Sequence, residues 1–182
     1  SIILLFFLFT HKILWTYLVI TISIISFFEF NNLIKKSFKK DKKKIYFFDI
    51  LSIIYLSFLV LISHDLYSQP PVVLLFLLLI CIFSDTGGYL TGKLIGGKKL
   101  TSISPNKTIS GSFGSFFFSI IPAFIYITIS NQIEIIGVSS IFNTEDIMLL
   151  IVICLFLSLT CQLGDLSISY FKRLAKVKDT GS

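Results

Sequence analysis

Residues 147–163 read IMLLIVICLFLSLTCQL, an apolar run of seventeen residues without a charge, and this run decides the fold class. A transmembrane helix needs about 20 mainly apolar residues, with a range of about 17–25, so this run is long enough to form one. The rest of the chain has the same character. Of 182 residues, 54% are hydrophobic and 14% are charged, against about 25% charged residues in soluble domains. We therefore expect an all-α, polytopic membrane protein.

Four further apolar runs are long enough to span a bilayer. They are residues 13–33, 45–62, 72–90 and 112–129. The apolar segment 2–9 is too short, and because the chain opens with Ser1 inside it, we expect the end of a longer helix. A cleaved signal peptide is the weaker alternative, since no basic region or cleavage site is visible. The sequence predicts one transmembrane domain, 1–182, with about five complete helices and a truncated first one, and we expect it to be incomplete at both ends.

The cations predict the orientation of these spans. If the segment before His11 exits to the outside, the alternate loops 35–44, 93–107 and 172–178 hold fifteen of the sixteen Lys and Arg residues. Short loops rich in Lys and Arg face the cytoplasm. We therefore expect a multi-pass membrane protein whose polar motifs face the cytoplasm. The cations are dispersed over loops that flank spans, so we expect no nucleic-acid partner.

The first polar motif covers residues 84–111 and begins inside a span. An unpaired carboxylate such as Asp85 costs several kcal/mol within the membrane. Asp85, Tyr89 and Lys93 are spaced to share one helix face, which favours the lining of a polar cavity over a structural ion pair. Gly87, Gly88 and Gly92 fit either close helix packing or room for a substrate.

The loop that follows carries Ser104, Lys107, Thr108 and Ser110, whose hydroxyl and ammonium groups could donate to phosphates beside the N-terminus of the next helix. It is not a P-loop, and its spacing alone does not separate a phosphate site from an ordinary basic loop.

The second polar motif covers residues 162–182. Asp165, Ser169 and Lys172 fall on one helix face, which Arg173 extends. Lys172, Arg173 and Lys178 would serve equally well as a topology signal. The position of Asp165 argues against a topology signal alone, because this carboxylate is expected at the membrane edge rather than out in water.

At these residues the chain resembles the integral-membrane phosphatidate cytidylyltransferases, also called CDP-diacylglycerol synthases. Their S-x-x-K-R-x-x-x-x-K-D pattern appears from Ser169 to Asp179, and their Q-x-G-D appears as Gln162-Leu-Gly-Asp165. Their D-[ST]-G-x-Y and S-P-x-K-T segments match Asp85-Thr86-Gly87-Gly88-Tyr89 and Ser104-Pro105-Asn106-Lys107-Thr108. A Glu between aromatic residues, here Glu29, is also typical of the family.

The resemblance implies the reaction of CTP with phosphatidic acid, giving CDP-diacylglycerol and pyrophosphate. It further implies a protein of the bacterial inner membrane with a cytoplasm-facing cavity at the active site. It implies that Asp165 and Asp179 bind Mg²⁺ and that Lys172, Arg173 and Lys178 hold phosphates. By the same analogy Ser104, Lys107 and Thr108 contact the nucleotide or lipid headgroup, and Asp85 and Tyr89 line the substrate cavity. We expect Asp85, Lys107 and Asp165 to converge.

The chain departs from the family pattern in two places. After Lys107-Thr108 the family has an aromatic residue and then Glu or Gln, whereas this chain has Ile109 and Ser110. The His-Gly-Gly and Asp-Arg-x-Asp part of the signature does not occur before Ser182, so 162–182 matches its first half. We therefore expect residues 1–182 to be inactive alone.

Two other functions stay open from the residues, a secondary transporter of an anionic solute and a CTP-dependent polyprenol or lipid kinase. A homodimer is compatible with the sequence, which does not decide the oligomeric state.

Overall fold

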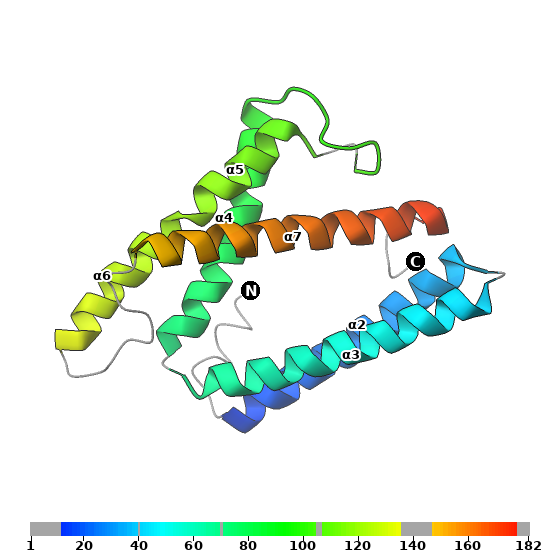
Figure 1. The fold of residues 1–182 in the computed structure, drawn as a ribbon, viewed down its shortest axis with the longest axis horizontal. Helices are drawn as coiled ribbons and strands as arrows, with labels where there is room; N and C mark the ends of the chain where they lie inside the picture. The colour runs from blue at the N-terminus through cyan, green and yellow to red at the C-terminus, as the bar shows by residue number, and fades with distance from the viewer. Residues whose placement is uncertain (1–11, 40, 70, 105–106, 136–146, 178–182) are drawn as a thin grey trace. The chain divides into compact units, whose positions relative to one another are not determined.

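The computed structural model describes residues 12–39, 41–69, 71–104, 107–135 and 147–177. Its helices, shown in Figure 1, are α2 (Lys12–Ser37), α3 (Lys42–Tyr67), α4 (Pro71–Leu94), α5 (Ile109–Ser119), α6 (Ile121–Ile135) and α7 (Ile147–Ala175). Within the described residues, five helical segments are long and apolar enough to cross a membrane. The expected all-α membrane fold is therefore confirmed.

The helices run past the apolar stretches that predict them. The run 13–33 predicts the helix that the structure extends to Lys12–Ser37, and the run 147–163 predicts one that continues to Ala175. Long cationic side chains such as Lys35 can cover apolar surface with their stems while the ammonium group reaches water. A helix can therefore continue through the membrane boundary into charged sequence.

The span expected at 112–129 is built from two helices rather than one. α5 ends at Ser119 and α6 begins at Ile121, because Pro122 has no N–H to donate and its ring crowds the preceding turn. Ile120 N instead donates to Phe117 O, three residues back, at 3.4 Å. The interruption thus follows from a single proline.

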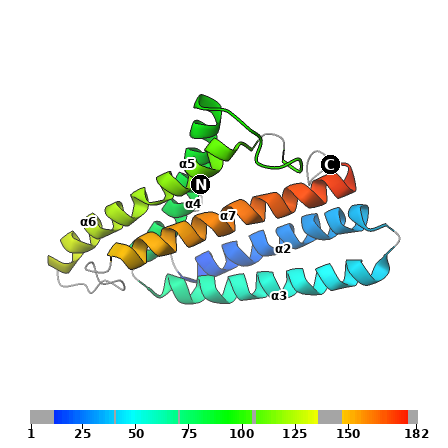
Figure 2. The ribbon, with the colours of Figure 1, turned by 45° about the horizontal axis from the view of Figure 1, so that its top comes forward.

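The chain divides into two compact units, and the first consists of Ser1–Pro71 and Ile168–Ser182. In it, α2 and α3 lie side by side (Figures 1 and 2). Polar contacts join the two helices: Trp15 Nε1 donates to Ser63 Oγ at 2.8 Å, and Asn31 Nδ2 donates to Asp49 Oδ1 at 2.7 Å. These bonds fix the register of the pair.

The end of α7 in the first unit is anchored by aromatic packing. Phe171 contacts Phe30, Phe38 and Phe48 with ring centroids 5.6, 6.4 and 5.2 Å away. Ser37 Oγ also donates to Phe171 O at 3.1 Å. Edge-to-face rings at such separations attract each other beyond their buried area.

Asp41 caps the start of α3. Lys44 N donates to Asp41 Oδ1 at 3.2 Å, and Lys44 Nζ lies 3.2 Å from Asp41 Oδ2. These contacts, the backbone hydrogen bond first, lower the pKa of Asp41 below its usual value. A side-chain oxygen at this position satisfies one of the N–H groups that a helix start leaves without a partner.

The second unit, Val72–Ser167, packs α4 closely against α5 through glycines. A Cβ on Gly111 would lie 2.8 Å from Gly88 O and 3.4 Å from Gly92 Cα, so only hydrogen fits between the two backbones. A Cβ on Gly114 would collide with the side chain of Thr91. Small residues let membrane helices approach in this way. Of the two interpretations of the glycines, close packing is therefore confirmed.

Candidate functional site

The second unit contains a polar cavity of about 350 Å³, at the small end of the range for ligand pockets. α4, the loop that follows it, α5 and α7 all contribute to its wall. The charged and polar lining side chains are Asp85, Tyr89, Lys93, Lys107, Thr108, Ser112, Ser115, Gln162 and Asp165. Gly88, Gly92 and Gly111 also line it, so these glycines serve both helix packing and access to the cavity.

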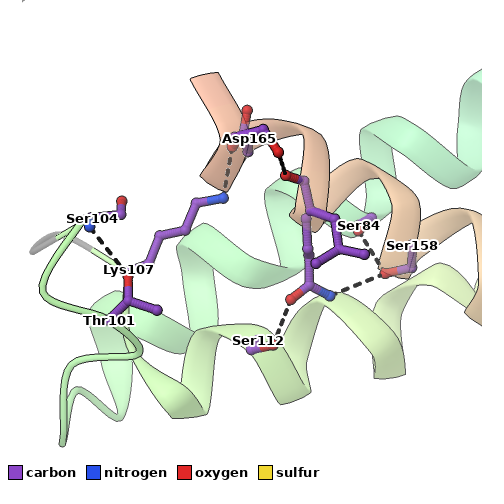
Figure 3. A network of polar contacts seen from close by, with 10 residues as sticks. Ser84, Thr101, Ser104, Lys107, Ser112, Ser158 and Asp165 are labelled. Atoms are coloured by element: carbon purple, nitrogen blue, oxygen red, sulfur yellow. Dashed lines mark hydrogen bonds and ion pairs between the residues drawn. The ribbon is translucent and has the colours of Figure 1, made fainter. Parts of the chain in front are cut away.

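Lys107 and Asp165 form an ion pair across this cavity, with Lys107 Nζ 2.8 Å from Asp165 Oδ2 (Figure 3). The side chain of Lys107 is 30% exposed and that of Asp165 is 68% exposed, so water screens the pair in part. Such pairs contribute about 0–1 kcal/mol to stability. The contact therefore shows that the two groups share one site, and it contributes little to the stability of the fold.

Backbone hydrogen bonds hold the loop that carries Lys107. Leu100 N donates to Lys107 O at 2.8 Å, and Ile109 N donates to Lys98 O at 3.0 Å. The loop leaves α4 through Gly96 and Gly97, whose φ angles of 63° and 101° favour glycine. This arrangement returns the chain to α4 and places Lys107 beside α7.

Asp85 brings a second carboxylate to the cavity. It lies close enough to Asp165 and Lys107 for their charges to act on it. One and two turns along α4, Tyr89 and Lys93 also line the wall, and Lys93 Nζ lies 5.6 Å from the Tyr89 ring centroid. The shared helix face expected for these three residues is therefore present, and Asp85, Lys107 and Asp165 converge as expected.

Ser104 and Thr108 differ in their relation to the cavity. Thr108 lines it and also caps α5, since its Oγ1 accepts from Gly111 N at 3.1 Å. Ser104 is not among the lining residues; its N–H donates to Thr101 Oγ1 at 3.2 Å, and its carbonyl accepts from Lys107 N at 3.1 Å. Ser104 thus shapes the loop that presents Lys107.

Ser110, which stands where the family has an acidic or amide residue, does not line the cavity. Its hydroxyl donates to Gly96 O at 2.5 Å. This bond ties the start of α5 to the turn after α4.

Of the predicted residues of the second motif, Asp165 belongs to the second unit, whereas Lys172 and Arg173 belong to the first. Lys172 and Arg173 occupy the last turn of α7, which closes with Val177 N donating to Lys172 O at 3.1 Å around the positive φ of Lys176. Their phosphate roles stay predictions. Lys178 and Asp179 lie outside the described residues.

The cavity carries oxygen donors of the kind that Mg²⁺ prefers. Among the described residues, no three His, Cys, Asp or Glu side chains form a complete metal cluster. Asp85 and Asp165 nevertheless share one cavity with the Gln162 amide. Mg²⁺ is commonly held by one or two carboxylates together with substrate phosphates. The donor set fits that mode of binding.

Sequence reasoning missed Gln162 and Ser112 as site residues. Both line the cavity, and Ser112 Oγ donates to Gln162 Oε1 at 2.5 Å. Gln162 stands in the Q-x-G-D segment, three residues before Asp165, so it was within reach of the motif. Ser112 carries no comparable signal, because one serine in an apolar span resembles any other.

Comparisons with known proteins show the family of the chain. The model of the family described as "Cytidylyltransferase family" matches residues 1–182. The chain is 36% identical over 137 residues to the phosphatidate cytidylyltransferase of Staphylococcus aureus (strain COL). The aligned region covers 74% of this chain and 48% of that protein. The chain is 35% identical to the proteins of that name from Staphylococcus epidermidis (strain ATCC 12228 / FDA PCI 1200), over 135 residues, and Staphylococcus saprophyticus, over 136 residues, with the same coverage.

The chain thus spans about half the length of the curated relatives it matches. No solved structure is significantly similar to it. The transporter and kinase alternatives find no support among the matches. The family model covers the whole sequence, and the cavity brings together its expected acidic and basic residues. The chain belongs to the cytidylyltransferase family.

Proposed function

We propose that the protein is a phosphatidate cytidylyltransferase, which converts CTP and phosphatidic acid to CDP-diacylglycerol and pyrophosphate. One observation carries the proposal: Asp85, Lys107 and Asp165, from three separate segments of a cytidylyltransferase chain, line a single cavity. The cation distribution further supports an inner-membrane protein whose cavity opens to the cytoplasm, where CTP is available.

In the proposed reaction a phosphate oxygen of phosphatidic acid attacks the α-phosphorus of CTP. A new P–O–P bond forms, and the bond between the α-phosphorus and the bridging oxygen breaks to release pyrophosphate. Both reactants are anions, so alignment and the neutralisation of charge dominate the barrier. Lys107 and Lys93 place two ammonium groups at the cavity for this purpose. The lipid supplies the nucleophile, so none is required from the protein.

Asp165 would hold Mg²⁺ together with Asp179, and the position of Asp85 makes it a further candidate ligand. When bound, the cation would neutralise phosphate oxygens as negative charge moves to the leaving group. Lys107, which pairs with Asp165 at 2.8 Å, would then be available to a phosphate oxygen.

The test is a lipid-labelling assay with the full-length protein in vesicles that contain phosphatidic acid. CTP labelled at the α-phosphorus should yield labelled CDP-diacylglycerol, whereas CTP labelled at the γ-phosphorus should leave the label in pyrophosphate. EDTA should abolish the product, and added Mg²⁺ should restore it. Transfer of γ-label to lipid would instead indicate a kinase, and the absence of labelled lipid with either substrate would contradict the proposal.

A further inference from the structure

A chain of polar side chains runs from the interior of the second unit to the wall of the cavity. Ser84 Oγ of α4 lies 2.8 Å from Ser158 Oγ of α7, and Gln162 Nε2 donates to Ser158 Oγ over a long 3.5 Å. Ser112 Oγ of α5 donates to Gln162 Oε1 at 2.5 Å. Figure 3 shows Ser84, Ser158 and Ser112 in this arrangement. Four side chains thus connect three helices.

The inner end of this chain is fully buried. Ser84 and Ser158 are each 0% exposed, and a buried hydroxyl that loses its partner is costly. The bond between them therefore favours one separation and one register of α4 and α7. Ser84 directly precedes Asp85, and Gln162 lies three residues before Asp165. The same bond therefore also restrains the two helices that carry the cavity carboxylates.

The hydrogen-bond inventory of Gln162 leaves one group for a ligand. A glutamine amide has two N–H donors and one carbonyl acceptor. Its carbonyl oxygen accepts a hydrogen bond from the Ser112 hydroxyl, and one N–H donates to Ser158 Oγ. The Ser158 hydroxyl can in turn donate a hydrogen bond to Ser84 Oγ. Within the part of the chain that the structure describes, the second N–H of Gln162 has no partner, and Gln162 lines the cavity.

This remaining donor differs from its charged neighbours. Asp85 and Asp165 accept hydrogen bonds when ionised, and Lys93 and Lys107 bring positive charge. A neutral N–H can bond a phosphate oxygen without changing the charge balance of the site. Because the amide is already held at both ends, little conformational entropy is lost when it binds.

We propose that Gln162 binds a phosphate oxygen of the nucleotide and that Ser112, Ser158 and Ser84 position its amide for that contact. The inference rests on the proposed function, and it assigns roles to a glutamine and three serines that the charge pattern did not single out. Ser158 and Ser84 are positioning residues, since they act through Gln162.

Two substitutions at Gln162 in the full-length protein test whether its amide donates a hydrogen bond to the phosphate or only packs against it. Gln162→Met keeps the size and removes the donor, and should lower kcat/KM for CTP on the order of 10-fold, as expected for a lost bond to a charged group. Gln162→Glu keeps the size and the acceptor for Ser112, but its carboxylate repels phosphate and should lower kcat/KM further. A Gln162→Glu variant as active as Gln162→Met, or more active, would overturn the role in donation.

Ser158→Ala tests the positioning role, and Ser119→Ala is its matched control. Ser119 is also 0% exposed, but its hydroxyl bonds Phe116 O of its own helix at 2.8 Å. Ser158→Ala should cost more thermal stability than Ser119→Ala, because it leaves the buried Ser84 hydroxyl without this partner. At a temperature where both variants are folded, only Ser158→Ala should lower kcat/KM, by about 3- to 10-fold. That loss should not add to the loss from Gln162→Met, because the two residues act through one contact. Equal kcat/KM values for the two serine variants would overturn the positioning role.

Failure of the proposed function can be told apart from failure of this inference. If the wild-type protein forms no CDP-diacylglycerol, the proposed reaction is wrong. Gln162 is then tested by the affinity of the purified full-length protein for inorganic pyrophosphate, which needs no turnover. Gln162→Glu should weaken that affinity at least about 10-fold. An affinity equal to that of the wild type would contradict the inference.

Discussion

Lys107 and Asp165 are partly exposed residues that we propose to act in the reaction because of where they lie. Their ion pair is partly exposed and so contributes little to stability. They line one cavity together with Asp85, and this shared position is the reason to propose a role in the reaction. Substitution of either residue should therefore affect turnover far more than folding.

Lys107→Ala should lower kcat/KM on the order of 100-fold, as the loss of a charge-stabilising donor does in other enzymes. Lys98→Ala is the matched control, because Lys98 lies in the same loop, is exposed and does not line the cavity. Kinetic assays of both variants at equal protein levels check the prediction. Similar rates for the two variants would mean that Lys107 is only another loop cation.

At the residue scale the sequence predicts the charged members of the site better than the neutral ones. A carboxylate such as Asp85 is costly inside an apolar span, so its position in the sequence alone indicates a cavity. Gln162 and Ser112 carry no such cost, and their importance appears only when α5 and α7 bring their oxygen atoms to 2.5 Å. Ser104 shows the reverse case, a motif residue that shapes the loop instead of lining the cavity.

Among the elements, the contact between α4 and α5 positions the loop that presents Lys107. It depends on glycines, because a Cβ on Gly114 would overlap the Thr91 side chain. Gly164, an exposed glycine of α7, has no such neighbour within 4 Å and provides the matched comparison.

Gly114→Ala should therefore destabilise the protein by about 1–3 kcal/mol through overpacking. Gly164→Ala should be neutral or stabilise it by up to about 1 kcal/mol, since Ala restricts the unfolded chain more than Gly does. Thermal unfolding of both variants in detergent measures the difference. Equal unfolding temperatures would show that α4 and α5 do not pack as closely as described.

The Asp41 cap of α3 should make the stability of the protein depend on pH. Hydrogen bonds from Lys44 lower the folded-state pKa of Asp41, so its ionised form contributes stability above the unfolded pKa of about 3.9. Asp41→Asn keeps a cap acceptor without a charge. The wild type should unfold at a higher temperature than Asp41→Asn at pH 7, and this advantage should disappear as pH falls through the lowered pKa. An advantage that persists at about pH 2 would contradict the assignment.

The element boundaries show where sequence patterns succeed and where they do not. Apolar runs locate all five candidate spans found among the described residues, because hydrocarbon excludes charge whatever the neighbouring helices do. They do not show that the run 112–129 breaks at Ile120, although Pro122 is visible in it. Asp85, Lys107 and Asp165 converge because backbone hydrogen bonds fold the loop that carries Lys107. Hydropathy does not predict those hydrogen bonds.

For the molecule as a whole, the cation distribution predicts the side on which the cavity opens. In a variant without the native cysteines, Gln69→Cys should react with a membrane-impermeant maleimide in intact cells. Lys98→Cys should react only after permeabilisation, because the loop 93–107 is predicted to face the cytoplasm. Both positions are exposed, so accessibility does not bias the comparison. The opposite labelling pattern would place the cavity on the outer side.

The central claim is that the cavity of Asp85, Lys107 and Asp165 transfers the cytidylyl group. The most direct measurement compares Asp165→Asn with Asp65→Asn, the same change at an exposed residue of α3. Each full-length variant is assayed for CDP-diacylglycerol formation from CTP, phosphatidic acid and Mg²⁺. We predict that Asp165→Asn loses at least about 100-fold in rate, while Asp65→Asn stays within about twofold of the wild type. A wild-type rate for Asp165→Asn would contradict the claim.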